Sequence, residues 1–172
     1  RIWLFEGNLP TAARWAQGIQ LEEQINIERL NLLRVIIALH RANYPRQGNS
    51  LPDIRTAIQY LEKKIRLLED TEWVELSIEL NILLALSFQV LGDEAGALKA
   101  LQEAVKRAEP GGYIRLFVDE GAPMRLLLAR LKNNGGTPQS YITKLLAQWE
   151  KEQAVQPLPF GFSTLPEPLS AR

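Results

Sequence analysis

The residues of this chain that could do chemistry are few and widely scattered. His40 is the single histidine, and cysteine is absent from all 172 residues. Without cysteine there is no thiolate nucleophile, no disulfide and no sulfur-ligated metal site. His40 falls at the end of a predicted helix beside Arg41, where an imidazolium would face the negative end of the helix dipole. We therefore expect His40 to cap a helix, and we expect no catalytic residue and no metal ligand.

Carboxylates and phosphate-binding loops offer no better candidate for catalysis or cofactor binding. Five acidic residues crowd one short stretch: Glu69, Asp70, Glu72, Glu75 and Glu79. At helical spacing they stagger along one face, which indicates a solvated surface rather than a cation site. Neither G-x-x-x-x-G-K-[ST] nor G-x-G-x-x-G occurs, so no cofactor is expected in this chain. The larger aromatics are interpreted as core residues rather than ligand-stacking platforms: Trp3, Trp15, Trp73, Trp149, Phe88 and Tyr60.

The charge balance argues against two classes of partner. Twenty basic residues oppose twenty acidic residues, so the net charge is zero and the broad attraction to nucleic acid or anionic lipid is missing. No apolar run approaches the roughly 18 residues of a membrane span, and no basic, then apolar leader opens the chain. We expect a cytoplasmic protein without a membrane partner.

The elements that position these residues are predicted to be helices. Apolar residues recur at intervals of three and four, which is typical of an all-α fold. Glycines at 7, 92 and 135–136 are expected to break helices, and Thr71 and Asp93 are expected to cap them. The short run 113–118 fits a strand or a helical turn, and we favour the turn because no partner strand is predicted. The predicted helices span 11–20, 22–42, 53–69, 72–91, 94–108, 123–132 and 138–152.

A repeat of 40 residues organises the helices into hairpins. The repeat aligns Ala57 with Ala97, and a small residue recurs at Ala12. The second unit has the tetratricopeptide (TPR) pattern: Gly92 turns the hairpin, while Ala97 and Ala104 allow close helix approach. We predict a right-handed stack of antiparallel helical hairpins, a TPR-like superhelix, with a plain antiparallel bundle as the alternative. About a dozen extra residues between His40 and Asp53 are expected to project as a loop.

The domain organisation follows from the two ends. Residues 1–152 form the predicted repeat domain, and 153–172 hold four prolines, which predicts an extended linker leading to a further domain. Arg1 stands where an initiator methionine would be, so we expect the natural protein to continue upstream.

The first helices of successive hairpins present a candidate binding groove. The predicted helix 72–91 places five residues within one arc: Glu75, Glu79, Ile82, Leu86 and Gln89. The predicted helix 22–42 has one polar stripe, formed by Asn31, Arg34, Ala38 and Arg41. If the two helices are neighbours, a basic stripe faces an acidic one, with Ile82 and Leu86 as an apolar floor. The groove then binds an effector or a partner; alternatively, Arg34 and Glu79 form a purely structural ion pair.

One motif resembles a known family. The run R-L-F-x-D-E-G-x-P-M comprises Arg115, Leu116, Phe117, Asp119, Glu120, Gly121, Pro123 and Met124. It is similar to the closing repeats of the helical sensor region in MalT-like, ATP-dependent LuxR-type transcriptional regulators. The opening W-L-F-E-G-N-L-P-T-A-A-R-W-A resembles a hairpin of that region, and the terminal E-P-L-S-A-R resembles the residues that open the family's helix-turn-helix.

The resemblance implies a bacterial, cytoplasmic regulator with an ATPase module upstream and a DNA-binding module downstream. ATP and DNA would then bind outside this chain, which would sense a small-molecule effector or a protein partner and relay the signal between the modules. The alternative is a stand-alone TPR adaptor that binds a partner peptide. A helical hydrolase or lyase has little support, because no nucleophile and base are paired.

Overall fold

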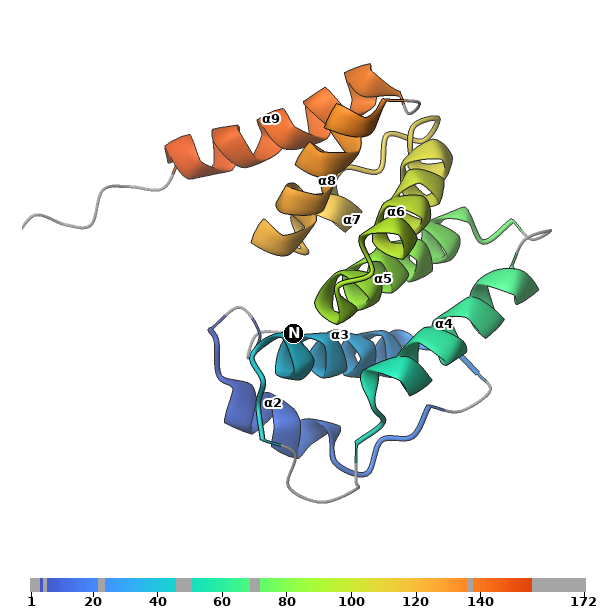
Figure 1. Cartoon of the computed structure of the whole chain (residues 1–172), viewed down its shortest axis with the longest axis vertical. Helices are drawn as coiled ribbons and strands as arrows, with labels where there is room; N and C mark the ends of the chain where they lie inside the picture. The colour runs from blue at the N-terminus through green and yellow to red at the C-terminus, as the bar shows by residue number, and fades with distance from the viewer. Residues whose placement is uncertain are drawn as a thin grey trace, which may run out of the picture.

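The computed structural model describes residues 4, 6–21, 24–45, 51–68, 72–135 and 138–155. These residues form helices and no strand, and the helices follow one another along the long axis of the molecule (Figure 1). The all-α class is therefore confirmed. The helices are α2 (Leu9–Ala16), α3 (Ile27–Arg41), α4 (Ile54–Leu67), α5 (Val74–Leu91), α6 (Glu94–Ala108), α7 (Arg115–Val118), α8 (Ala122–Asn134) and α9 (Gln139–Val155).

Side-chain caps set the helix starts. Asn8, Asn26, Asp53 and Asp93 each accept a hydrogen bond from the backbone N–H three residues further on. The prediction of Asp93 as a cap is confirmed, whereas Thr71 lies outside the described residues. The predicted helix 22–42 began too early, because Asn26 holds the first turn of α3 at Ile27.

Two other predicted helices have different boundaries in the structure. The helix expected at 11–20 is α2 at 9–16, because the Asn8 side chain caps its start. The last helix was expected to end at 152 and α9 continues to Val155, so the start of the predicted linker is helical. The run 113–118 contains the four-residue helix α7, which confirms a helical turn there. Residues 46–50 of the long loop and 156–172 of the predicted linker lie outside the described residues.

The repeat correctly identifies small residues of the core. Ala12, Ala57 and Ala97, which the repeat aligns, are all fully buried, as is Ala104. Gly92 closes the α5–α6 hairpin with a left-handed φ of 78°, a conformation that an L side chain adopts only with strain. Ala97 and Ala104 lie on α6, which packs against α5 as the hairpin prediction requires.

Helix α5 lies at the centre of the core and contacts α3, α4, α6 and α7. Its 18 residues have a mean hydropathy of 1.6, which meets the length and composition of a membrane span. The expectation that no apolar run approaches that length was therefore wrong. α5 is this apolar because it packs at the centre of the core, where 56% of these 18 residues are buried inside the protein.

Candidate functional site

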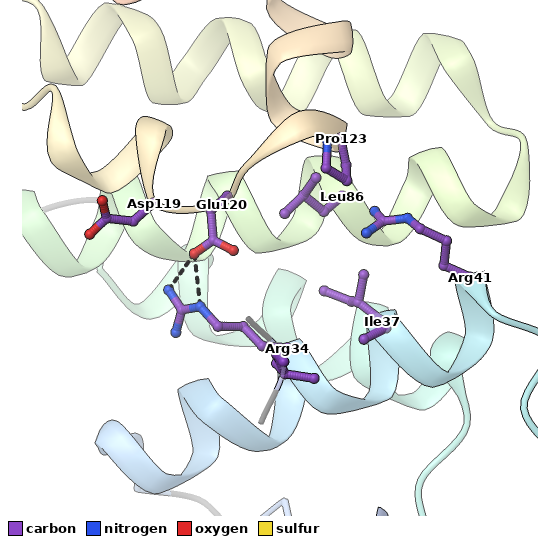
Figure 2. Close-up of a pocket in the computed structure, with 9 residues that line it drawn as sticks. Arg34, Ile37, Arg41, Leu86, Asp119, Glu120 and Pro123 are labelled. Carbon is purple, nitrogen blue, oxygen red and sulfur yellow. Dashed lines mark hydrogen bonds and ion pairs between the residues drawn. The ribbon is translucent and has the colours of Figure 1, made fainter. Parts of the chain in front are cut away.

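A buried arginine joins three separate parts of the chain. Arg34 on α3 is 6% exposed, and its Nη2 lies 2.6 Å from Oε1 of Glu79 on α5. Its Nε donates a 2.8 Å hydrogen bond to Oε1 of Glu120, which lies between α7 and α8, and its Nη2 is 2.7 Å from the same oxygen. The guanidinium is thus held by two carboxylates that are far apart in the sequence. Figure 2 shows its two contacts with Glu120. We call Arg34, Glu79 and Glu120 the charged clamp.

The charged clamp compensates the cost of burying Arg34 in an apolar helix. Burial alone would lower the pKa of Arg34, but the attraction of Glu120, together with hydrogen bonds to Glu120 and Glu79, outweighs it and raises the pKa. Removing water from an ion costs several kcal/mol unless partners replace the lost hydration. The guanidinium therefore stays charged and fixes the distance between α3, α5 and the α7–α8 segment.

The segment that delivers Glu120 is anchored on both sides. Phe117 and Met124 have no exposed surface, and the Phe117 ring packs edge-on against Tyr141 of α9, with centroids 6.5 Å apart. Gly121 turns the chain with a φ of 74°, so α8 begins directly after Glu120. Phe117, Gly121 and Met124 all belong to the R-L-F-x-D-E-G-x-P-M motif. The motif therefore holds the Glu120 carboxylate in position beside Arg34.

A cavity of about 220 Å³ adjoins the charged clamp. Its walls come from α3, α5 and the α7–α8 segment, and in Figure 2 Arg41 lies at one end, Arg34, Glu120 and Asp119 at the other, and aliphatic groups between them. The lining residues are Leu4, Arg34, Ile37, Ala38, Arg41, Leu86, Asp119, Glu120 and Pro123. The cavity thus lies between the same elements that the charged clamp connects: α3, α5 and the α7–α8 segment.

Arg41 is the second cation of this cavity and is held differently from Arg34. Its Nη2 donates a 3.3 Å hydrogen bond to Oε1 of Gln89, and Gln89 in turn donates to the carbonyl of Pro123 at 3.2 Å. Burial lowers the pKa of Arg41, an effect that the attraction of Glu120 partly offsets. Within the described part of the chain, Arg41 forms no ion pair, so a neutral amide is its hydrogen-bond partner.

The structure brings together four of the seven residues that sequence analysis assigned to the groove. Arg34 meets Glu79, and Arg41 from the same polar stripe meets Gln89, so the basic stripe does face the acidic one. Leu86 lines the cavity. The pairing of Arg34 with Glu79 is the arrangement that the structural alternative anticipated.

The other three predicted groove residues lie elsewhere. Ile82, expected on the apolar floor, is fully buried in the core, because α5 is covered on nearly all sides. Glu75 is exposed and lines a separate hollow with Trp73 and Tyr113. Asn31 is half-buried on α3 and does not line the cavity.

Glu120 was missed as a site residue because helix periodicity says nothing about a loop 86 positions away from Arg34. The signal that could have found it is the motif itself, where an acidic residue precedes Gly121. Ile37 and Pro123 were missed for a similar reason, since apolar side chains do not distinguish a cavity wall from a core.

Two further sequence interpretations need revision. Trp73 was interpreted as a core aromatic, but it is 66% exposed because it precedes the first turn of α5. Trp149 is buried as expected, and Trp15 packs against the core, whereas Trp3 lies outside the described residues. Within the acidic series, Glu79 belongs to the charged clamp rather than to a solvated face.

The chemistry of the remaining polar groups is limited. His40 lines a shallow hollow beside Arg41, with Gln89 and Leu126 on its other walls. In the ranges that the structure describes, no three His, Cys, Asp or Glu residues are grouped to hold a metal ion. The charged residues that line the cavity are two arginines and two acids; Arg34 is paired with Glu120, and Asp119 is paired with Arg115 of α7.

Comparison with known proteins gives one match. Residues 1–134 match the family model described as the MalT-like TPR region. The matched range includes the whole charged clamp and the cavity beside it, and it ends before α9. No curated protein and no solved structure matches the chain.

Proposed function

The chain belongs to the family of MalT-like TPR regions, and from that premise we propose that it is the effector-sensing or partner-binding domain of a LuxR-type transcriptional regulator. In this proposal an ATPase module precedes the domain and a DNA-binding module follows it. ATP and DNA bind to those modules, and the whole protein works in the cytoplasm. The domain binds its effector at the cavity and relays the event between its neighbours.

The charged clamp is the observation that carries this proposal. It connects α3 and α5 with the segment that leads into α8 and α9, and the cavity touches the same surfaces. A ligand shifts a conformational equilibrium only through contacts that differ between the two states. A ligand in this cavity contacts both sides of the clamp, so it is placed to favour either the clamped or the opened arrangement.

A non-catalytic role accompanies this proposal. TPR-like helical repeats are in general binding modules, and the cavity wall offers carboxylates, guanidinium groups and aliphatic side chains. Among the residues that the structure describes, no serine, threonine, lysine or histidine lines it. Recognition by charge and shape is the chemistry that this set supports best.

A reporter assay with the full-length regulator tests the proposal. Glu120→Gln weakens one charge-assisted contact of the clamp, so it should shift the dependence of promoter activity on effector concentration. Glu94→Gln is the matched control, because Glu94 at the start of α6 forms an exposed 3.5 Å pair with Arg130 of α8, and neither residue lines the cavity. Effectors for the assay come from a thermal-shift screen, since a ligand that binds only the folded state raises its stability. Identical response curves for Glu120→Gln and the wild type, at equal protein levels, would contradict the proposal.

A further inference from the structure

Most of the charged side chains that line the cavity already have ionic partners. Arg34 and Glu120 contact each other at 2.7 Å, and Asp119 forms an ion pair with Arg115 of α7. Arg41 is the remaining charged residue of the lining, and within the described part of the chain it forms no ion pair. The lining thus leaves the positive charge of Arg41 without a direct counter-ion.

The two arginines of the lining also differ in how far their burial is compensated. Burial lowers the pKa of both, but at Arg34 the carboxylates of Glu120 and Glu79 reverse this effect and the pKa is raised. At Arg41 burial outweighs the attraction of Glu120, so the pKa is lowered. An anion in contact with Arg41 would supply the attraction that Glu120 alone supplies only in part.

The surroundings of Arg41 leave room and hydrogen-bond donors for such an anion. Arg41 is exposed, and it also lines a second, shallow hollow, where no acidic residue lies among the described lining residues. Its hydrogen-bond partner is the neutral amide of Gln89, at a long 3.3 Å. A guanidinium carries five N–H donors, so this single contact leaves several of them for a ligand. The Arg41 end of the cavity is therefore accessible to an anion and equipped to hold it.

The wall beside Arg41 is aliphatic. Ile37, Leu86 and Pro123 lie between Arg41 and the charged clamp (Figure 2). A ligand with an apolar tail would cover this wall and keep water away from a pair formed with Arg41, which strengthens the attraction between the charges. The volume of about 220 Å³ corresponds to about seven water molecules at ~30 Å³ each, which suits a single short-chain compound.

We propose that this cavity binds a short-chain aliphatic monocarboxylate, with its carboxylate on Arg41 and its tail against Ile37, Leu86 and Pro123. A carboxylate matches the planar fork of a guanidinium, which holds it through two parallel hydrogen bonds. One negative charge is enough, because the other charges of the lining are already paired. The inference rests on the proposed sensor function and specifies its effector class.

Calorimetric titration of the 172-residue chain with 4-methylpentanoate as the probe tests the inference. Two analogues each remove one feature: 4-methylpentanamide lacks the charge, and acetate lacks the aliphatic tail. We expect 4-methylpentanoate to bind and each analogue to bind at least tenfold more weakly, because each leaves either Arg41 or the aliphatic wall without its match. Equal affinity for 4-methylpentanoate and either analogue, or no binding of 4-methylpentanoate, would overturn the inference.

Substitutions at Arg41 assign the binding to this cavity. Arg41→Gln should weaken the binding of 4-methylpentanoate at least tenfold, and Arg41→Lys should weaken it less, because it keeps the charge but loses the planar fork. Arg130→Gln is the matched control, since Arg130 is exposed on α8 and does not line the cavity. Full affinity in Arg41→Gln would overturn the placement, and the melting temperature of each variant shows whether it is folded.

The two proposals fail in different ways. If an uncharged sugar binds the chain and shifts promoter activity of the full-length regulator, while 4-methylpentanoate does not bind, the carboxylate inference is wrong and the sensor function stands. If 4-methylpentanoate binds through Arg41 but does not change promoter activity, the binding site stands and the sensor function is wrong for this ligand.

Discussion

The α5–α6 hairpin and the charged clamp hold their helices together by opposite means. In the hairpin, Ala97 and Ala104 are fully buried, so the two helices meet through close apolar contact. In the clamp, a buried guanidinium spans α3, α5 and the α7–α8 segment, and a cavity lies beside it. Close packing tolerates little change in shape, whereas a ligand with charges of its own can compete for ion pairs. The hairpin is therefore held by apolar packing, whereas the neighbouring clamp is held by charge.

The largest effect is expected from removing the centre of the clamp. Arg34→Ala leaves Glu79 and Glu120 facing each other in a largely buried site, so the free energy of unfolding should fall by roughly 3–5 kcal/mol. Urea denaturation measures this. Replacing all three residues, as Arg34→Met with Glu79→Gln and Glu120→Gln, should recover most of the loss because no charge remains buried. A loss below about 1 kcal/mol in Arg34→Ala would place the clamp among ordinary surface ion pairs.

The hairpin should respond next most strongly, to added volume. Ala97→Leu inserts methylene groups where Ala97 is fully buried, and it should lower the free energy of unfolding by about 1–3 kcal/mol. Ala95→Leu is the matched control, because Ala95 lies exposed in the first turn of α6. If both variants unfold at the wild-type urea midpoint with the same slope, the hairpin is not closely packed at Ala97.

The turn of the hairpin should show a smaller effect. Gly92 has a φ of 78°, and Ala in this left-handed conformation costs roughly 1–2 kcal/mol. Gly92→Ala should lower the melting temperature accordingly, and Gly92→Asn should lower it less, because Asn tolerates this conformation better. Equal melting temperatures for the two variants would mean that backbone strain is not what Gly92 relieves.

The smallest effect at neutral pH is expected at Tyr141, where α9 packs on the motif segment. Burial, with a further contribution from Glu109, raises the pKa of Tyr141 to about 12. The unfolded chain releases this proton near pH 10, so the stability linked to Tyr141 is complete below pH 10 and is lost as the pH rises through about 12. Tyr141→Phe should remove this part of the pH dependence.

The same variant has a second expected outcome at pH 7. The Tyr141 hydroxyl is buried and, among the residues described, has no hydrogen-bond partner. Its removal should therefore leave stability unchanged or raise it by up to about 1 kcal/mol. Urea midpoints at pH 7, 10 and 11.5 measure both effects. A parallel decline of wild type and variant above pH 10 would show that other groups cause the alkaline loss.

Local signals in the sequence determined the hairpins of this protein. The spacing of apolar residues predicted helices, the repeat placed Ala12, Ala57 and Ala97 in the core, and Gly92 marked the turn. These features depend on residues a few positions apart, whose geometry within a helix is fixed at 3.6 residues per turn. The same regularity put Arg34 and Glu79 on facing stripes of neighbouring first helices.

Only the tertiary structure decided what covers those faces. The periodicity of apolar residues defines the face of a helix but not what packs against that face. Ile82 was therefore expected on a groove floor, but it is buried in the core. Trp73 was expected in the core, but it is exposed. Glu120 reaches Arg34 across 86 positions because buried Phe117 and Met124 hold the turn at Gly121 in place. The clamp and its cavity exist because separate elements converge, and that convergence depends on the packing of the whole stack.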